Sequence, residues 1–174
     1  MMRAFIAIAG FMLALAIPHQ TQGQQQAFLR VDQAVWTDVV DRATKNYTHV
    51  YKSPVRLRQS SLWMQLRGSP ELLEQMKGDP NGRVRIRHIW KKYVSDSVRI
   101  DHDQSLDVGR KEDLRKLSYE VDAEGFFRWR VWSDKVQLSR GQWRVDVVWE
   151  SDEPVLCTSA SGNERPCSFN LEVH

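Results

Sequence analysis

Apolar and polar residues alternate along several stretches of the chain, which is typical of β-strands with one face against a core. Between residues 128 and 132, for example, Trp129 and Val131 alternate with Arg128, Arg130 and Trp132. The clearest stretches are 62–67, 83–90, 128–132 and 143–149, with further candidates at 35–40, 97–100, 117–121 and 169–173. This pattern of seven or eight short strands predicts an all-β fold, an antiparallel β-sandwich of the immunoglobulin-like type.

One short helix is predicted over Ser69–Gly78, inserted between two of these strands. Ser69 is a good N-cap, and Pro70 fits the first helical position. Gly78 favours termination of the helix at that point.

The first 23 residues have the order of charge and hydropathy that is typical of a secretory signal peptide. Arg3 supplies the positive start, residues 4–17 form an uncharged apolar run, and Pro18 interrupts it. We expect cleavage after Gly23, which leaves residues 24–174 as a single β-sandwich domain, periplasmic or secreted. A retained membrane anchor is the alternative, although the run is shorter than the roughly 20 residues that span a bilayer.

The two cysteines, Cys157 and Cys167, suit an oxidising compartment and are expected to form a disulfide bond. The residues between them are rich in Ser, Gly, Asn and Pro and have little apolar surface of their own. Two unpaired thiols are the alternative.

Composition changes this picture in two ways. All seven tryptophans lie after residue 35, so large rings are expected in the core, on a binding surface, or in both. The net charge of +3 is small, and basic residues alternate with acidic ones along the sequence. Nucleic-acid-binding proteins more often concentrate their basic residues in one stripe, so nucleic acid is not an expected partner.

The strongest candidate for a ligand-binding surface is the outward face of the stretch 128–132. If Trp129 and Val131 face the core, then Arg128, Arg130 and Trp132 face solvent together. An indole beside two guanidinium groups suits the face of a sugar ring or a carboxylate. The alternative is that a neighbouring strand half-covers Trp132 and that the arginines are simply solvated.

Two features of the stretch 83–90 are expected to be structural. Arg83, Arg85 and Arg87 share one strand face, which either meets an acidic partner or, as we expect, stays solvated. His88 falls on the opposite, apolar face, where a hydrogen-bonded core histidine is expected.

The stretch 101–112 imitates a calcium loop in its spacing of oxygen-bearing side chains. These side chains belong to Asp101, Asp103, Ser105, Asp107 and Glu112. Leu106 occupies the place where the sharp turn of such a loop needs glycine, so we expect an ordinary polar loop. Neither a metal nor a cofactor is predicted.

Several blocks occur in an order that is similar to a known family. The blocks are 34–42, 62–67, 88–92, 128–133 and 141–145. The most specific part is Arg-Trp-Arg-Val-Trp-Ser at 128–133 followed by Gly-Gln-Trp-Arg-Val at 141–145. Over residues 33–174 the chain thereby resembles a family of exported bacterial domains known as domain of unknown function two-nine-one-four. The resemblance implies export and a compact β domain, with no catalytic residues.

Together these features predict a non-catalytic binding module that recognises a glycan or an acidic partner at the cell envelope, through Arg128, Arg130 and Trp132. One alternative is an envelope assembly factor that acts through sheet-edge pairing or through the helical insertion. Another is a small hydrolase, although the sequence has no nucleophile elbow, zinc motif or phosphate loop. No membrane span is expected in the mature chain.

Overall fold

A computed structural model describes the protein over residues 27–52, 56, 58–78, 84–108, 121–158 and 162–174. Four predictions lie outside these residues, wholly or in part. They concern the signal peptide at 1–23, Arg83, Glu112 and residues 117–120 of one expected strand.

The described chain forms two main sheets and one small hairpin. Sheet I consists of β1 (Leu29–Thr37), β4 (Val50–Tyr51), β5 (Gln59–Gly68), β8 (Phe127–Val136), β10 (Leu156–Thr158) and β11 (Glu164–Pro166). Sheet II consists of β6 (Arg85–Val94), β7 (Ser97–Asp107), β9 (Gly141–Trp149) and β12 (Ser168–Val173). The hairpin is formed by β2 (Val40–Asp41) and β3 (Asn46–Tyr47).

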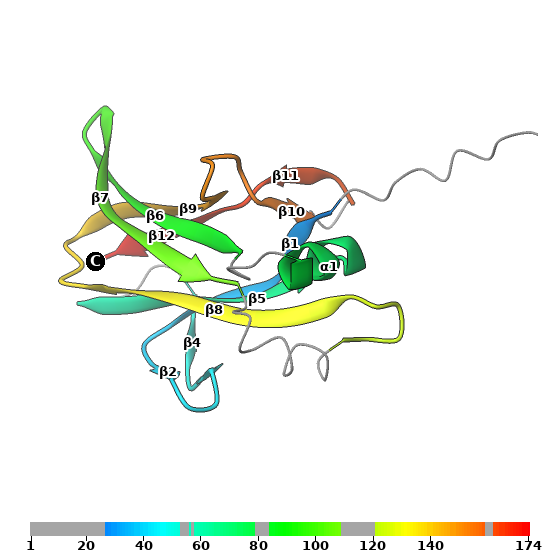
Figure 1. Ribbon diagram of the computed structural model, residues 1–174. Helices are drawn as coiled ribbons and strands as arrows, with labels where there is room; N and C mark the ends of the chain where they lie inside the picture. Colours follow the sequence, from blue (N-terminus) through cyan, green and yellow to red (C-terminus); the bar gives the residue numbers. More distant parts are fainter. Residues whose placement is uncertain (1–26, 53–55, 57, 79–83, 109–120, 159–161) are drawn as a thin grey trace, which may run out of the picture.

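The strand order places β8 and β7 at the ends of their sheets. Sheet I has the order β11-β10-β1-β5-β8, with β4 beside β1, and sheet II has the order β12-β9-β6-β7. The two sheets lie face to face as two layers (Figure 1). The predicted all-β sandwich is thus confirmed, with one exception to its antiparallel order, because β1 and β10 run parallel.

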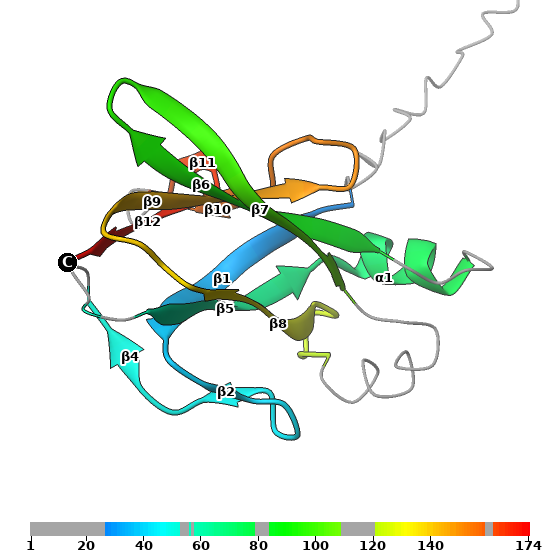
Figure 2. The same ribbon diagram turned by 90° about the vertical axis from the view of Figure 1, so that its left-hand side faces the viewer.

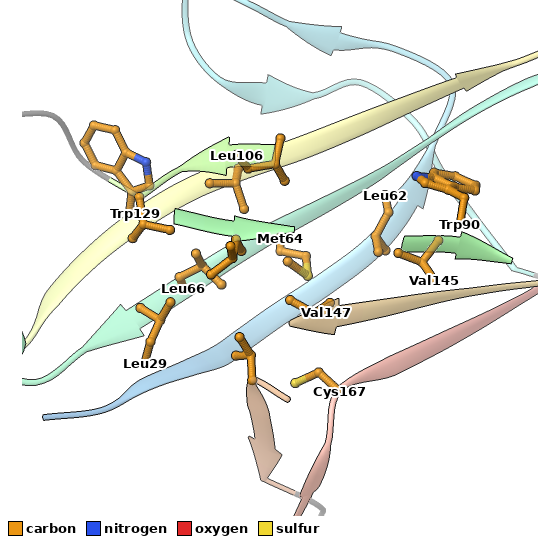
Figure 3. Packing of buried hydrophobic residues seen from close by; sticks show 14 of the residues in the cluster. Leu29, Leu62, Met64, Leu66, Trp90, Leu106, Trp129, Val145, Val147 and Cys167 are labelled. Carbon is orange, nitrogen blue, oxygen red and sulfur yellow. The ribbon is translucent and has the colours of Figure 1, made fainter. Parts of the chain in front are cut away.

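The core lies between the two sheets and is built from the alternating apolar positions. Leu62, Met64 and Leu66 of β5 are fully buried, and they face Val145 and Val147 of β9 across the interior (Figure 3). Fully burying a side chain of this size contributes about 1.5–3 kcal/mol to stability. The burial of alternate residues explains why these stretches form strands rather than helices.

The helix α1 (Pro70–Gly78) connects β5 to β6, as predicted. The Ser69 hydroxyl caps it by accepting a hydrogen bond from the Leu72 N–H at 3.3 Å, and it accepts a second from the Phe28 N–H at 3.2 Å. Ser69 is fully buried, so it also ties the helix to the start of sheet I. No described helix is long and apolar enough to cross a membrane.

Several strands are longer than the sequence pattern indicates, β1 and β7 by the most. β1 begins at Leu29 rather than at residue 35, and its register against β5 shifts between Val31 and Gln33. β7 continues to Asp107 rather than ending at Ile100. The register shift in β1 breaks the period-two pattern, which explains why the alternation is not visible there.

The disulfide bond between Cys157 and Cys167 is confirmed. Cys157 lies in β10 of sheet I, and Cys167 directly precedes β12 of sheet II, so the bond joins the two sheets at one end of the sandwich.

Candidate functional site

The alternation along β8 places the three predicted site residues on its outer face. Trp129 and Val131 are buried, whereas Arg128 is exposed and Arg130 and Trp132 are half-buried. The inward and outward orientations are therefore as predicted, but the Trp132 ring is half-buried, as the alternative interpretation expected. Sheet I thus presents Arg128, Arg130 and Trp132 on the surface away from sheet II.

The register between β5 and β8 builds rows of side chains on this outer face. Arg67 lies directly opposite Arg128, Gln65 opposite Arg130, and Trp63 opposite Trp132. Like charges directly opposite each other destabilise a sheet. Arg67 is compensated by an ion pair with Asp122 at 3.0 Å. In the part of the chain that the structure describes, neither Arg128 nor Arg130 makes an ion pair.

The hairpin of β2 and β3 covers part of the same face. It lies on the side of sheet I that is away from sheet II (Figures 1 and 2). The indole N–H of Trp63 donates to the Lys45 carbonyl oxygen at 2.8 Å, and the Tyr47 ring contacts the Trp63 ring edge-on. Trp63 points outward as its position predicts, but it is only 3% exposed because the hairpin covers it. Trp63 therefore anchors the hairpin.

The hairpin, β7 and the free edge of β8 enclose an open groove of about 660 Å³. Its lining contains two indoles, four cationic side chains and two carboxylates. The lining residues are Arg42, Lys45, Arg85, Gln104, Ser105, Leu106, Asp107, Trp129, Arg130, Val131, Trp132 and Asp134. The structure therefore brings Arg130 and Trp132 into one groove, whereas Arg128 lies beyond its lining.

Three of the four cations in the groove have no ion-pair partner among the described residues. These are Arg42, Lys45 and Arg130. The Lys45 ammonium lies 4.0 Å from the centroid of the Trp129 ring, within the range of a cation–π interaction. Arg85 is the exception, because it pairs with Asp107 at 3.0 Å.

The sequence analysis missed Arg42 and Lys45. Both lie in the short turn between β2 and β3, where no periodicity indicates which way a side chain points. Lys45 has a left-handed backbone with a φ of 57°, which is uncommon for a residue other than glycine. The contacts of Trp63 with Lys45 and Tyr47 hold this turn beside the edge of β8.

The predicted polar loop at 101–112 is wrong over its first seven residues, because Asp101–Asp107 belong to β7. Their carboxylates are engaged in ion pairs: Asp101 with Lys135 at 2.7 Å and Asp103 with Arg87 at 2.6 Å. The hydrogen bond from Lys135 lowers the pKa of Asp101, and the one from Arg87 lowers the pKa of Asp103. Within the described ranges, no group of three or more His, Cys, Asp or Glu side chains is placed to hold a metal ion.

The arginine row of β6 is occupied by the protein's own carboxylates. Arg87 pairs with Asp103 at 2.6 Å and with Asp152 at 2.7 Å, and Arg85 pairs with Asp107 and with Glu150. We expected this face to be solvated. The guanidinium groups of Arg85 and Arg87 are instead neutralised within the molecule, unlike the three groove cations that have no ion-pair partner in the described part of the chain.

His88 is a core residue, as predicted, but only one of its ring nitrogens is hydrogen-bonded to a described residue. Its Nδ1 is hydrogen-bonded to the Ser133 hydroxyl at 2.7 Å, and the Trp90 indole N–H donates to the same hydroxyl at 2.9 Å. Its Nε2 has no partner in the described part of the chain. Burial lowers the pKa of His88 to about 3, so the ring is neutral at neutral pH. The cluster joins β6 to β8 across the core.

Comparisons with known proteins do not indicate a function for the chain, so its interpretation rests on the geometry of the groove. The chain matches no protein-family model and no curated protein. Among solved structures it is similar to the CARDB domain of a Pyrococcus furiosus protein in complex with di-metal ions. That similarity has a TM-score of 0.34 and 8% identity, and it covers 85% of this chain and 92% of that chain. A TM-score this low supports no conclusion about function, and the resemblance to the domain of unknown function stays a prediction.

Proposed function

We propose that the protein is a non-catalytic binding module that recognises a carboxylate-bearing ligand, either an acidic glycan or an acidic segment of a partner protein. Arg130 and Trp132 would contact the ligand in the groove beside β8, and Arg128 would extend the contact along the outer face. The observation that carries this proposal is a group of cations that have no ion-pair partner among the described residues and lie beside two indoles in one groove.

The distribution of ion pairs in the rest of the sandwich supports the proposal. Arg87 and Lys91 on the outer face of sheet II are held by carboxylates at 2.6 Å. A charge-assisted hydrogen bond contributes roughly 1.5–3 kcal/mol. A ligand carboxylate in the groove could form such bonds with the cations there that no described carboxylate engages. The indole of Trp132, which lies beside Arg130, offers a flat apolar surface to a sugar ring or a side chain.

We further propose that the module works outside the cytoplasm, in the periplasm or after secretion. The disulfide bond supports this location, because such bonds persist in oxidising compartments and are rare in the cytosol. The proposal predicts that the mature protein begins at Gln24, which mass spectrometry of the exported protein tests. A mature N-terminus at Met1 would contradict it.

Binding is tested by titration calorimetry with two acidic probes, an oligogalacturonate and a peptide rich in glutamate, and with their neutral counterparts. We expect the neutral probes to bind at least tenfold more weakly, since each lost charge-assisted contact costs about 1.4 kcal/mol or more. Arg130→Ala and Trp132→Ala should each weaken binding about tenfold.

Arg165→Ala is the matched control, because Arg165 is exposed on β11 at the opposite edge of sheet I. It should bind both acidic probes as the unchanged protein does. If Arg128→Ala, Arg130→Ala and Trp132→Ala all retain full affinity for an acidic probe, the assignment of the site is wrong. If neither acidic probe binds, the proposed function is wrong.

A further inference from the structure

Among the described residues, the outer edge of β8 is open from Arg128 to Val136, whereas Phe127 at its start is bridged by Val121. All ten residues of β8 pair with β5, from Phe127 opposite Gly68 to Val136 opposite Gln59, without a register shift. On the other side of β8 no described strand pairs with it. Every second residue of an edge strand directs its backbone N–H and C=O groups away from the sheet. After Phe127, β8 therefore presents a regular row of backbone groups that pair with no other described residue.

That row opens into the groove. The lining includes Trp129–Trp132 and Asp134 from β8, with Gln104–Asp107 of β7 facing them. At about 3.3 Å per residue, the lining part of β8 spans roughly 17 Å from its first residue to its last, which matches an extended peptide of about six residues. A strand lying there would be bounded by β7 on one side and by the hairpin on the other.

The charges of the groove select among peptides. Arg42, Lys45 and Arg130 have no carboxylate partner in the described chain, whereas the two lining carboxylates are already engaged. Asp134 accepts a hydrogen bond from the Ser61 hydroxyl at 2.6 Å, and Asp107 pairs with Arg85 at 3.0 Å. Among the described residues, the groove thus offers cations and no free anion, so acidic side chains are favoured and basic ones are repelled.

We infer that an extended acidic peptide segment of a partner protein adds to β8 as a further antiparallel or parallel strand of sheet I. This inference rests on the proposed function and specifies its ligand. Backbone pairing with an exposed edge supplies affinity, and side-chain contacts supply specificity, in peptide recognition of this kind.

Because a strand is pleated, the peptide that adds to β8 is expected to alternate two kinds of side chain along its sequence. Successive side chains of a strand point to opposite faces. Side chains on the outer face would meet Arg130 and the hairpin turn, and those on the inner face would meet Leu106 and Trp129, which are each 8% exposed. The expected segment therefore has Asp or Glu at every second position and apolar residues between them.

A second copy of this chain is a poor occupant. Pairing β8 with β8 of another copy would bring Arg128 and Arg130 of the two copies close together, and like charges on paired strands are destabilising. An acidic glycan would satisfy the cations but has no regular row of amide donors to pair with β8. Both alternatives are outcomes of the experiment below.

The experiment uses a fluorescein-labelled peptide of alternating Glu and Val and measures its binding to the full protein by fluorescence anisotropy. Two further peptides carry N-methyl groups on alternate residues. The first is methylated at the odd positions and the second at the even positions, so that each peptide loses the N–H donors of one edge only. N-methylation removes a backbone donor and leaves the side chains unchanged. We expect one N-methylated peptide to bind at least tenfold more weakly and the other to bind within threefold of the parent, because only one edge faces β8.

Two protein-side measurements complete the test. Arg130→Glu should lower the affinity for the Glu-Val peptide at least tenfold. Arg165→Glu, on the far edge of sheet I, should leave that affinity unchanged. Amide hydrogen exchange within 129–134 should slow on binding, because β8 gains backbone partners.

The outcomes separate this inference from the proposed function. If both N-methylated peptides bind like the parent and exchange along β8 does not change, the edge-pairing inference is overturned while anion binding stands. Binding of oligogalacturonate without binding of any peptide likewise overturns the edge-pairing inference and leaves anion binding intact. Self-association through β8 that the peptide does not displace also overturns it. Failure of every acidic probe overturns the inference and the proposed function together.

Discussion

The buried histidine of the core makes stability depend on pH. His88 is fully buried between the sheets, with Nδ1 at hydrogen-bond distance from Ser133 and with Nε2 unpaired among the described residues. Protonation would place a positive charge in the core, and no described carboxylate offsets it. Burial accordingly lowers the pKa of this ring from 6.5 in the unfolded chain to about 3 in the folded protein. The test of this effect is to lower the pH from 7.5 to 5.

The sign and size of the effect follow from these two pKa values. Below pH 6.5 the unfolded chain binds a proton that the folded protein excludes, so acid favours unfolding. The stability that the neutral ring confers is fully present above pH 6.5 and is lost as the pH falls towards 3. The free energy of unfolding should decrease by about 1.4 kcal/mol per pH unit in this window, or about 2 kcal/mol at pH 5.

Carboxylates contribute in a different pH range. Asp101 and Asp103 have pKa values lowered from 3.8 by Lys135 and Arg87. The stability that they confer is present above pH 3.8 and is lost below it, so it does not change between pH 7.5 and 5. His88 therefore dominates the part of the curve that the assay uses.

Urea unfolding followed by tryptophan fluorescence gives the free energy of unfolding at each pH. His88→Gln keeps a polar group near Ser133 and removes the titration, so the difference between the two proteins should shrink by about 2 kcal/mol between pH 7.5 and 5. A difference that stays constant to within about 0.5 kcal/mol would refute the reasoning. NMR provides a check without mutation, because one histidine ring should not titrate above pH 5.

Three further predictions concern stability and use the same urea assay. Reduction of the disulfide, which closes a loop with a sequence separation of 10, should lower the free energy of unfolding by about 2–3 kcal/mol; no change on reduction would contradict this. Ser69→Ala should cost about 1 kcal/mol or more, because it removes the cap of α1 and leaves buried N–H groups without a partner. Gly68→Ala should cost at least about 2 kcal/mol, since a Cβ there would lie 2.1 Å from the buried Phe127 ring, whereas Gly78→Ala meets open space and should be nearly neutral.

Alternation alone was sufficient to locate the strands whose two faces meet different surroundings. β5 and β8 pack one face against sheet II and turn the other away from it, so polar and apolar residues must alternate along them. The orientation of Arg128, Arg130 and Trp132 follows directly from this rule. The helix cap at Ser69 and the disulfide are local features, and they too could be predicted from the sequence.

The rule fails where a strand meets polar surroundings or where another segment covers its outer face. β7 is an edge strand whose Asp103 and Asp107 pair with arginines of β6, so its sequence is as polar as that of a loop. Trp63 occupies an outward position but is buried, because the β2–β3 hairpin packs on it. The groove could not be predicted for the same reason. It combines a turn, two strand edges and a long-range contact, and none of these leaves a periodic signal.

The charges of the groove also explain how an open edge strand can persist in a folded protein. A regular edge without protection invites pairing with other copies of the same chain, and lysine beside the edge is a common protection. Here Lys45 is held at the edge of β8 by the contact between Trp63 and the hairpin, and Arg130 points outward from β8 itself. These cations repel another β8, which carries the same charges, and attract a segment of opposite charge. Protection against self-association and selectivity for an acidic ligand are therefore two consequences of one electrostatic arrangement.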